Sequence, residues 1–550
     1  MTYLFSNTSS IFQSNGTAIS TTNPLAVTGN TVITGGNVNV SNLPDVSVTA
    51  FEEPLAVSIT PVVQADTIYG INPDLWSQST LRGGTIAVDS NSLFRVASGT
   101  SAGGYARLAT ASYMTYQPGQ GSMFRWTAAF TTTADANATT KNATGITSIV
   151  QNTGPIDREN GFSIGYSGAA GTKIGILHRL AANIEIRTLT ITTAPTGSQT
   201  ANITLNNTSY LISLTTSSST QYTAAQLAKN LKANVSADNL WDIESCGNTV
   251  TFSYYAPGSQ AGTYSFSSSG TGTLAAGTFS QIQAGTAAVD SWTYIDNWNG
   301  TVPASFDPTK LNVYGLDFRW LGAGRVRFFM EDPTTGKLTV LHTITWTKDQ
   351  TGLYPHLKNP SLRIAYRSGT TNTGVTPSTN VVVSGASIFG AVQGAITQSG
   401  LSQGYFALNS TNRSADTVHH LLSIQNPYIR NGVVNKSSLV VLDLTMSAQG
   451  NDPSIIYILK NPVGTSDLLV FNPLPNANAY NFAQFSISDV EGNLTIDSPA
   501  NIQTVGINSS AQFDLRAYNL TINPGDYVSV FFQSSSIITR TAVGMTWKVD

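Results

Sequence analysis

Charge is the scarcest property of this chain. Only 10% of its 550 residues are Asp, Glu, Lys or Arg, against about 25% in an average soluble domain. The mean hydropathy is nevertheless close to zero, at -0.02, so uncharged Ser, Thr, Asn, Gln and Gly supply the polarity. Such side chains suit exposed faces of strands and tight turns better than helix surfaces. The composition therefore predicts a large, β-rich protein of an extracellular type.

Disulfides, a basic surface and membrane-directed segments are lacking too. The single cysteine, Cys246, excludes an internal disulfide, which favours folding in a reducing cytoplasm. A net charge of -3 offers no basic face for duplex nucleic acid. The N-terminal residues do not read as a signal peptide, and no apolar run approaches the roughly 18 residues of a membrane span. We expect no nucleic-acid partner and no membrane insertion, and we expect the protein to leave the cell that makes it in an assembled particle, by lysis.

Motifs for catalysis and metal binding are also missing. No nucleophile elbow and no phosphate-binding loop occurs, and no histidine has the spacing of a metal ligand. The five histidines are His178, His342, His356, His419 and His420. We predict no enzyme activity and no catalytic, cofactor-binding or metal site.

Carboxylates are the remaining catalytic option. A pair of them across a cleft could hydrolyse a glycosidic bond, and acidic loops could bind calcium, although acidic residues in turns commonly only shape the turn. The candidates are Asp157, Glu159, Asp317, Glu331 and Asp332. Hydrolysis and calcium binding therefore stay as alternatives.

Aromatic residues gather between positions 292 and 329. Tyr314, Leu316, Phe318 and Trp320 alternate with other residues, which fits one face of a strand, so we expect core packing. Exposed rings that stack on the sugars of a host glycan are the alternative. The group comprises Trp292, Tyr294, Trp298, Tyr314, Phe318, Trp320, Phe328 and Phe329.

Changes in composition and in strand spacing along the chain predict four parts, which occupy five segments. Residues 1–66 are rich in Ser, Thr, Asn and Pro and contain a repeated Pro-Leu-Ala-Val; they are expected to form an extended N-terminal arm for attachment or interlocking, with a flexible leader as the alternative. Strand-length runs separated by Gly, Pro and Asn turns follow. The parts are the arm (1–66), a central sandwich (67–186 and 286–395), an inserted domain (187–285) and a C-terminal sandwich (396–550).

The inserted segment contains the clearest helix signal. Thr223 is a plausible N-cap, and Gln226 three residues later completes a capping box. Leu227 and Leu231 follow at a spacing of four, which places them on one helix face. The sequence therefore predicts an all-β protein, a multidomain β-sandwich or jelly roll, with a small inserted β-plus-one-helix domain and an extended N-terminal arm.

Several colinear segments carry a resemblance to a known group of proteins. They are Tyr116-Gln117-Pro118-Gly119-Gln120-Gly121, Glu159-Asn160-Gly161-Phe162-Ser163-Ile164-Gly165-Tyr166, Ile174-Gly175-Ile176-Leu177-His178-Arg179, Trp298-Asn299-Gly300, Phe306-Asp307-Pro308-Thr309-Lys310, Arg319-Trp320-Leu321-Gly322-Ala323-Gly324, residues 327–336 and Leu341-His342-Thr343-Ile344. Together they resemble virion structural proteins of tailed phages, notably those of aquatic bacteria, with relatives in large DNA viruses. The resemblance implies lectin-like or jelly-roll sandwiches and brings no catalytic motif.

The resulting expectation is a non-enzymatic virion protein, a fibre, spike or capsid-decorating subunit. Its arm would attach it to other virion proteins of the capsid, neck or tail, and a homotrimer is favoured because trimerisation covers exposed strand edges. Host-glycan adhesion is the alternative, and a polysaccharide depolymerase is a third hypothesis.

Overall fold

The computed structural model describes most of the chain from Ile59 onward. The described residues are 59–132, 149–167, 173–180, 182–235, 240–346, 355–370, 374–377, 380–396, 402–409, 412–462, 469–475, 477, 482–488, 501–507, 509–518 and 520–549. They form antiparallel sheets with one α-helix, which confirms the predicted all-β, multidomain sandwich class. Residues 1–58 of the predicted arm lie outside the described residues.

The central sandwich has two facing sheets. The first has nine strands in the order β21-β20-β19-β6-β23-β4-β3, with β24 paired to β6 and β1 paired to β24. These strands are β1 (Ile59–Asp66), β3 (Thr85–Val88), β4 (Phe94–Ala97), β6 (Gly121–Thr132), β19 (Asn312–Phe318), β20 (Val326–Glu331), β21 (Leu338–Ile344), β23 (Val381–Gly385) and β24 (Ser387–Gln393).

The second sheet of the central sandwich has seven strands in the order β18-β9-β8-β7-β22-β5-β2. They are β2 (Trp76–Leu81), β5 (Tyr105–Thr110), β7 (Val150–Pro155), β8 (Gly161–Tyr166), β9 (Gly175–Arg179), β18 (Asp290–Tyr294) and β22 (Ile364–Gly369). A short 3-10 helix, η2 (Ile295–Asn297), follows β18.

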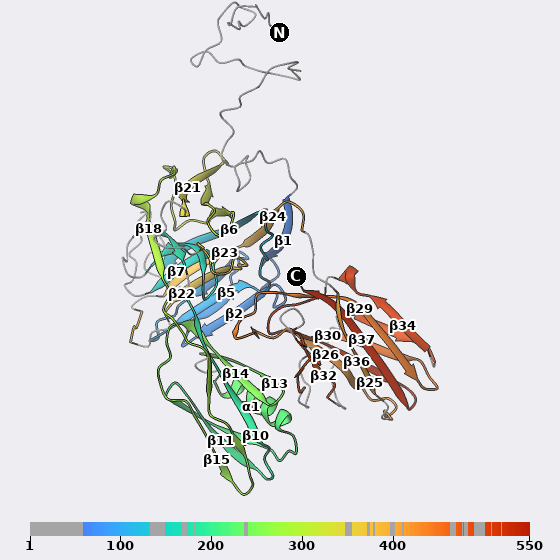
Figure 1. Cartoon of the computed structure of the whole chain (residues 1–550). Helices are drawn as coiled ribbons and strands as arrows, with labels where there is room; N and C mark the ends of the chain where they lie inside the picture. The colour runs from blue at the N-terminus through green and yellow to red at the C-terminus, as the bar shows by residue number, and fades with distance from the viewer. Residues whose placement is uncertain are drawn as a thin grey trace, which may run out of the picture. The chain divides into compact units, whose positions relative to one another are not determined.

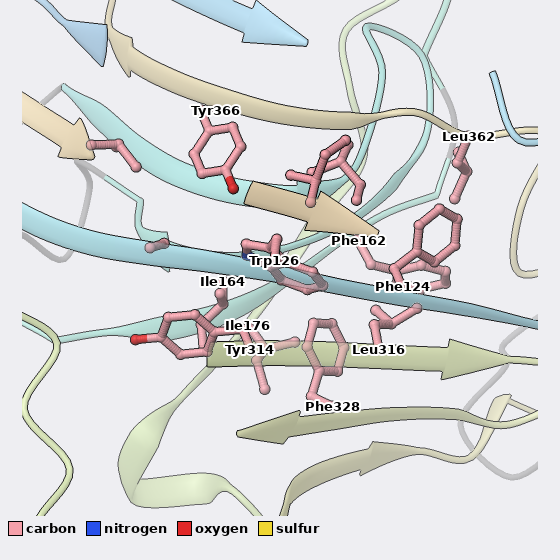
Figure 2. Packing of buried hydrophobic residues seen from close by; sticks show 14 of the residues in the cluster. Phe124, Trp126, Phe162, Ile164, Ile176, Tyr314, Leu316, Phe328, Leu362 and Tyr366 are labelled. Atoms are coloured by element: carbon pink, nitrogen blue, oxygen red, sulfur yellow. The ribbon is translucent and has the colours of Figure 1, made fainter. Parts of the chain in front are cut away.

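Large apolar side chains fill the space between these two sheets. Figure 2 shows Trp126 and Tyr314 from the nine-stranded sheet among Phe162, Ile176 and Tyr366 from the seven-stranded sheet. Alternate residues of each strand point inward, as the period of a pleated strand requires. Because apolar area removed from water stabilises by roughly 25 cal/mol per Å², this aromatic core is the main stabilising element of the sandwich.

The inserted domain has its own core. One sheet has the order β13-β14-β10-β16 with β17 paired to β10, and a three-stranded sheet has the order β12-β11-β15. The strands are β10 (Ile184–Thr193), β11 (Gln199–Leu205), β12 (Thr208–Leu214), β13 (Trp241–Cys246), β14 (Thr249–Pro257), β15 (Ser265–Gly270), β16 (Ala275–Ala276) and β17 (Ser280–Gln283).

The helix α1 (Thr220–Val235) supplies part of that core. Leu227 and Leu231 are fully buried against apolar residues of both sheets, and Figure 1 shows α1 beside β13. The cap differs from the predicted one. Ser219 Oγ accepts a hydrogen bond from the Tyr222 amide at 3.2 Å, so Ser219 is the N-cap. Thr223 lies inside the helix, where its hydroxyl donates to the Ser219 carbonyl at 2.8 Å.

The C-terminal sandwich also has two sheets (Figure 1). One has the order β25-β37-β29-β34 with β35 paired to β29, and the other β31-β32-β26-β36-β30-β33; β27 and β28 form a separate hairpin. The elements are β25 (Gln403–Asn409), β26 (His419–Gln425), β27 (Ile429–Arg430), β28 (Val433–Val434), β29 (Leu439–Gln449), β30 (Ser454–Lys460), β31 (Asn472–Pro473), β32 (Gln484–Ser486), β33 (Asn501–Val505), β34 (Ser509–Asp514), η3 (Arg516–Tyr518), β35 (Thr521–Ile522), β36 (Tyr527–Ser534) and β37 (Arg540–Val549).

The first described strand corrects the extent of the predicted arm. Sequence analysis placed residues 59–66 in the arm, but they form β1, which pairs with β24 from Ile59 opposite Gln393 to Asp66 opposite Ser387. Ala65 belongs to the core of the central sandwich. Within the described residues, no helix is long and apolar enough to cross a membrane.

Candidate functional site

The junction of three modules, namely the central sandwich, the inserted domain and the C-terminal sandwich, contains several buried charged residues. It starts in the turn between β7 and β8. Asp157 Oδ1 accepts hydrogen bonds from the amides of Glu159 and Asn160 at 2.7 and 2.8 Å, which is the local turn that an aspartate favours. Gly161 then opens β8 at φ +133°, where an added Cβ would lie 2.5 Å from the Pro155 carbonyl oxygen.

The second carboxylate oxygen of Asp157 faces the C-terminal module. Asp157 Oδ2 forms an ion pair with the Nζ of Lys436, and the two side chains are only 3% and 4% exposed. Burial by itself raises the pKa of Asp157, but the Lys436 ammonium and the two turn amides outweigh it and hold the pKa below its ordinary value. Burial likewise lowers the pKa of Lys436, and Asp157 reverses that effect so that the pKa is raised. Both groups are therefore charged.

Two acidic residues of β13 reach the junction because of strand alternation. Trp241 and Ile243 point into the core of the inserted domain, so Asp242 and Glu244 lie on the opposite face. Arg158, next to Asp157, donates from Nη1 to Asp242 Oδ2 at 2.8 Å. This bond joins the central sandwich to the inserted domain.

Arg158 is also enclosed by aromatic rings. Its guanidinium carbon lies 4.2 Å from the ring centroid of Tyr255 and 5.7 Å from that of Tyr428. Burial opposes the charge, but Tyr428, Asp242 and Tyr255 outweigh it and raise the pKa of Arg158. Cation–π contacts of this kind gain strength when water is excluded.

Glu244 connects the inserted domain to the C-terminal module through backbone groups. Its two carboxylate oxygens accept from the amides of Tyr428 and Ile429 at 2.9 and 3.1 Å. Burial raises the pKa of Glu244, and these two amides oppose the rise. A further backbone bond runs from the Gly247 amide to the Phe471 carbonyl at 2.8 Å.

A cavity of about 350 Å³ lies beside these contacts. Residues of all three modules line it, among them Arg107, Arg158, Asp242, Glu244, Arg363 and Asp526. Two of its carboxylates are paired with basic groups: Asp242 with Arg158, and Asp526 with Lys460 at 3.5 Å. The arrangement is suited to holding modules together, and its carboxylates are engaged in bonds that fix their orientation.

The predicted histidines lie in buried positions. His178 Nε2 donates to the His356 carbonyl at 2.6 Å, and both rings pack near Trp346 in the central sandwich. Burial lowers the pKa of His178 and of His356 to about 4. His342 lies in β21 and is 8% exposed.

The adjacent pair His419 and His420 lies in β26 of the C-terminal sandwich, at 0% and 1% exposure. His420 contacts Ser423 Oγ at 2.7 Å, and Ser423 Oγ lies 2.6 Å from Ser529 Oγ. These atoms resemble a base and a nucleophile in spacing, but their burial keeps a substrate away. Burial also lowers the pKa of His420 to about 4.

The predicted acidic residues are not brought together as one pair across a cleft. Asp317 forms a buried two-pronged ion pair with Arg327, at 2.9 and 2.6 Å. Asp332 accepts from the Thr334 amide at 2.9 Å in an exposed turn, and Glu331 ends β20. Asp157 and Glu159 lie together in the turn between β7 and β8, and Glu331 and Asp332 lie together at the end of β20. Burial raises the pKa of Glu159.

The aromatic group divides into two sets. Core packing is confirmed for Trp298, Tyr314, Phe318, Phe328 and Phe329, which are buried. Trp292, Tyr294 and Trp320 are half-buried.

The remaining features are the environment of Cys246 and the grouping of possible metal ligands. Burial raises the pKa of the Cys246 thiol to about 12, which disfavours the reactive thiolate. Among the described residues, no three His, Cys, Asp or Glu side chains gather as they would around a metal ion.

Sequence reasoning missed the residues that form the junction, namely Arg158, Asp242, Glu244, Tyr428 and Lys436. One signal was present. Asp242 and Glu244 alternate with the apolar Trp241 and Ile243, which predicts two acids on the outer face of a strand. Their partners lie far away in sequence, so only the tertiary structure identifies them.

Comparisons with known proteins give little further information. No family model matches the sequence, and no curated protein matches it. Among solved structures, the chain is similar to the Faustovirus major capsid protein, at 8% identity and a TM-score of 0.09, over 93% of this chain and 92% of that chain. A likeness this slight carries no argument about the role of the chain, so the resemblance to tailed-phage virion proteins stays a prediction.

Proposed function

We propose that this chain is a non-enzymatic structural component of a virus particle, a fibre, spike or capsid-decorating protein. In this proposal the N-terminal residues attach it to other virion proteins, and copies of the chain associate, with a trimer favoured. The sequence resemblance and the low charge support the proposal, because low charge permits close packing without self-repulsion.

The observation that carries the proposal is the set of ion pairs and hydrogen bonds at the junction of the three modules. Asp157–Lys436, Arg158–Asp242 and the Glu244 contacts join all three modules. Breaking the Asp157–Lys436 pair would leave a charge that is buried and unpaired, which is strongly unfavourable. Asp242 is 42% exposed, but without it the guanidinium of Arg158, which is only 11% exposed, would lose its carboxylate partner. A rigid multi-module body is what a particle component requires, whereas an enzyme with moving domains would need a weaker junction.

Deletion of residues 1–58 tests the attachment. The deletion ends before β1, so the described sheets stay complete. Particles that lack the chain would be complemented with either full-length or shortened protein. We expect only the full-length protein to join the particles, while both have the same Tm. Equal incorporation of the shortened protein would contradict the role of the N-terminal residues.

Light scattering on the full-length protein tests the association. A mass near three times 58.2 kDa supports a trimeric fibre or spike. A monomer would contradict self-association in solution, and would favour a decorating subunit whose symmetry its partners impose.

Host-glycan adhesion is a second candidate, and one observation favours it. Trp292 and Tyr294 alternate on β18, the edge strand of the seven-stranded sheet, and their rings are stacked 6.3 Å apart at 10°. Parallel half-buried rings can stack on sugars. The double substitution Trp292→Ala and Tyr294→Ala should abolish binding to host cells, while Tyr69→Ala, which alters a fully exposed tyrosine, should have no effect.

A further inference from the structure

Two arginines face each other on the outer side of the seven-stranded sheet. Arg107 on β5 is directly opposite Arg367 on β22 in the antiparallel register. Residues opposite each other in a sheet project to the same face, and the neighbouring Leu108 and Tyr366 point to the core. Both arginines are nevertheless nearly inaccessible, with exposures of 2% and 8%.

Neither guanidinium is neutralised by a carboxylate among the described residues. Arg367 Nε donates to the neutral Asn152 Oδ1 at 2.9 Å, and the Nη2 atoms of both Arg107 and Arg367 are buried without a partner. Burying an unpaired cation is costly. Desolvation, followed by the charge of Arg179, lowers the pKa of Arg367 to about 10, and desolvation also lowers the pKa of Arg107.

The nearby acids are already engaged. Asp157 pairs with Lys436, Asp242 with Arg158, and Asp290 with Arg179 through two bonds of 2.8 and 2.7 Å. Each of these acids therefore has a basic partner of its own. Arg107 and Arg367 leave a local excess of positive charge.

This excess borders an open space. A cavity of about 240 Å³ is lined by Arg107, Arg158, Arg179 and Arg367, by Tyr105 and Tyr255, and by one acidic residue, Asp157, which is paired with Lys436. Val150, Pro257 and Thr370, which also line it, are partly exposed to solvent. The volume equals roughly eight liquid water molecules, which limits a ligand to about one sugar ring.

We infer that this cavity binds the carboxylate of one acidic sugar unit. A planar guanidinium fork matches a carboxylate with two parallel bonds. Arg107 and Arg367 both line the cavity, and the Nη2 atom of each makes no hydrogen bond. Tyr105 and Tyr255, which also line it, can pack against a sugar ring. The bound carboxylate supplies the negative charge that the two buried arginines lack. This inference goes beyond the structural role proposed above and does not depend on it.

Calorimetric titration of the full-length protein with sodium D-glucuronate tests the inference, with D-glucose as the sugar lacking a carboxylate and sodium sulfate as a plain anion. We expect glucuronate to bind and to raise the Tm, and glucose to do neither. Arg367→Gln and Arg107→Gln should each weaken glucuronate binding by about tenfold to a hundredfold, the range for one charge-assisted hydrogen bond. The matched control is Arg95→Gln, because Arg95 is 56% exposed; it should bind as the unaltered protein does.

Three results would overturn the inference. They are equal responses to glucuronate and glucose, sulfate binding as strong as glucuronate binding, and glucuronate binding that survives both arginine substitutions.

The stability of the ligand-free protein gives an independent measurement. Because Arg107 is a buried charge without a carboxylate partner, Arg107→Met should leave the Tm of the ligand-free protein unchanged or raise it, as expected where a binding site is kept at the cost of stability. A large fall in Tm would show that the guanidinium stabilises the fold itself, and would contradict the assignment. If Arg107→Met does not fold, that outcome counts against the inference, and the Arg367→Gln titration is the second measurement.

Discussion

Asp157 and Lys436 form an ion pair that joins the turn between β7 and β8 to the segment between β28 and β29, with both side chains more than nine-tenths buried. A pair of this kind often adds little net stability compared with apolar side chains, since desolvation offsets the attraction. The pair instead favours one arrangement of the modules over others, because any other placement would leave two buried charges unpaired.

Removing one partner of this pair should therefore be much worse than removing both. We expect Lys436→Met to lower the free energy of unfolding by about 3–5 kcal/mol, and the double substitution Asp157→Leu with Lys436→Met to recover most of that loss. Urea unfolding measures both. The control is Arg516→Met, since Arg516 is 62% exposed in its pair with Asp443 and such pairs contribute about 1 kcal/mol or less. A double variant as unstable as the single one would contradict this account.

The same pair defines a range of pH. The pKa of Asp157 is lowered from 3.8, so its contribution is present above that value and is lost as the pH falls through the lowered pKa. The pKa of Lys436 is raised from 10.5, so its contribution is present below that value and is lost as the pH rises through the raised pKa. Both side chains therefore stay charged, and the ion pair stays intact, from mildly acidic to strongly basic solution.

Buried histidines are expected to lower the stability of the folded protein in acidic solution. The pKa values of His178, His356 and His420 are lowered from 6.5 to about 4, so the unfolded chain binds more protons between these values. Stability should fall as the pH decreases from about 6.5 towards 4, by up to about 1.4 kcal/mol per pH unit for each histidine.

His356→Phe isolates one of these contributions, because Phe keeps the ring that packs near Phe162 and Trp346. Urea unfolding of the unaltered protein and the variant between pH 7 and pH 4.5 measures the difference. We expect a shallower loss of stability in the variant. The same slope in both proteins would show that His356 is not neutral in the folded state.

Capping of α1 gives a third prediction. Ser219 Oγ accepts from the Tyr222 amide, so Ser219→Ala should destabilise the inserted domain by about 1 kcal/mol. Lys229→Ala, an exposed change in the middle of the same helix, should have little effect. Thermal unfolding followed by circular dichroism compares them; a Ser219→Ala protein as stable as the Lys229→Ala protein would exclude this cap.

The fold class could be predicted from the sequence because strand alternation and helix spacing are set by residues only a few positions apart. Alternation in Tyr314, Leu316, Phe318 and Trp320 predicted one strand face, and the structure has this strand as β19, which ends at Phe318, before Trp320. The spacing of Leu227 and Leu231 predicted a helix face, as the structure shows. The N-cap prediction was wrong for a local reason. Several hydroxyl side chains precede the helix, and Thr223, which has the capping-box spacing, instead donates to the carbonyl four residues before it.

The junction was beyond the reach of sequence patterns. Glu244 binds two backbone amides, at Tyr428 and Ile429, and every residue other than proline has such an amide. No side-chain motif therefore marks the partner. The positions of Arg107 and Arg367 were likewise beyond sequence patterns. The two residues lie opposite each other only because of the register of β5 and β22, which are distant in sequence.

The route of the chain through the seven-stranded sheet has one more consequence. The inserted domain leaves after β9 and returns at β18, and these two strands are direct antiparallel neighbours, with Arg179 opposite Asp290 and bonded to it. The whole insert thus occupies the position of a hairpin loop. A different domain, or a short turn, could therefore replace the insert while β9 and β18 keep their register, but the exchange would also remove Asp242 and Glu244 from the junction.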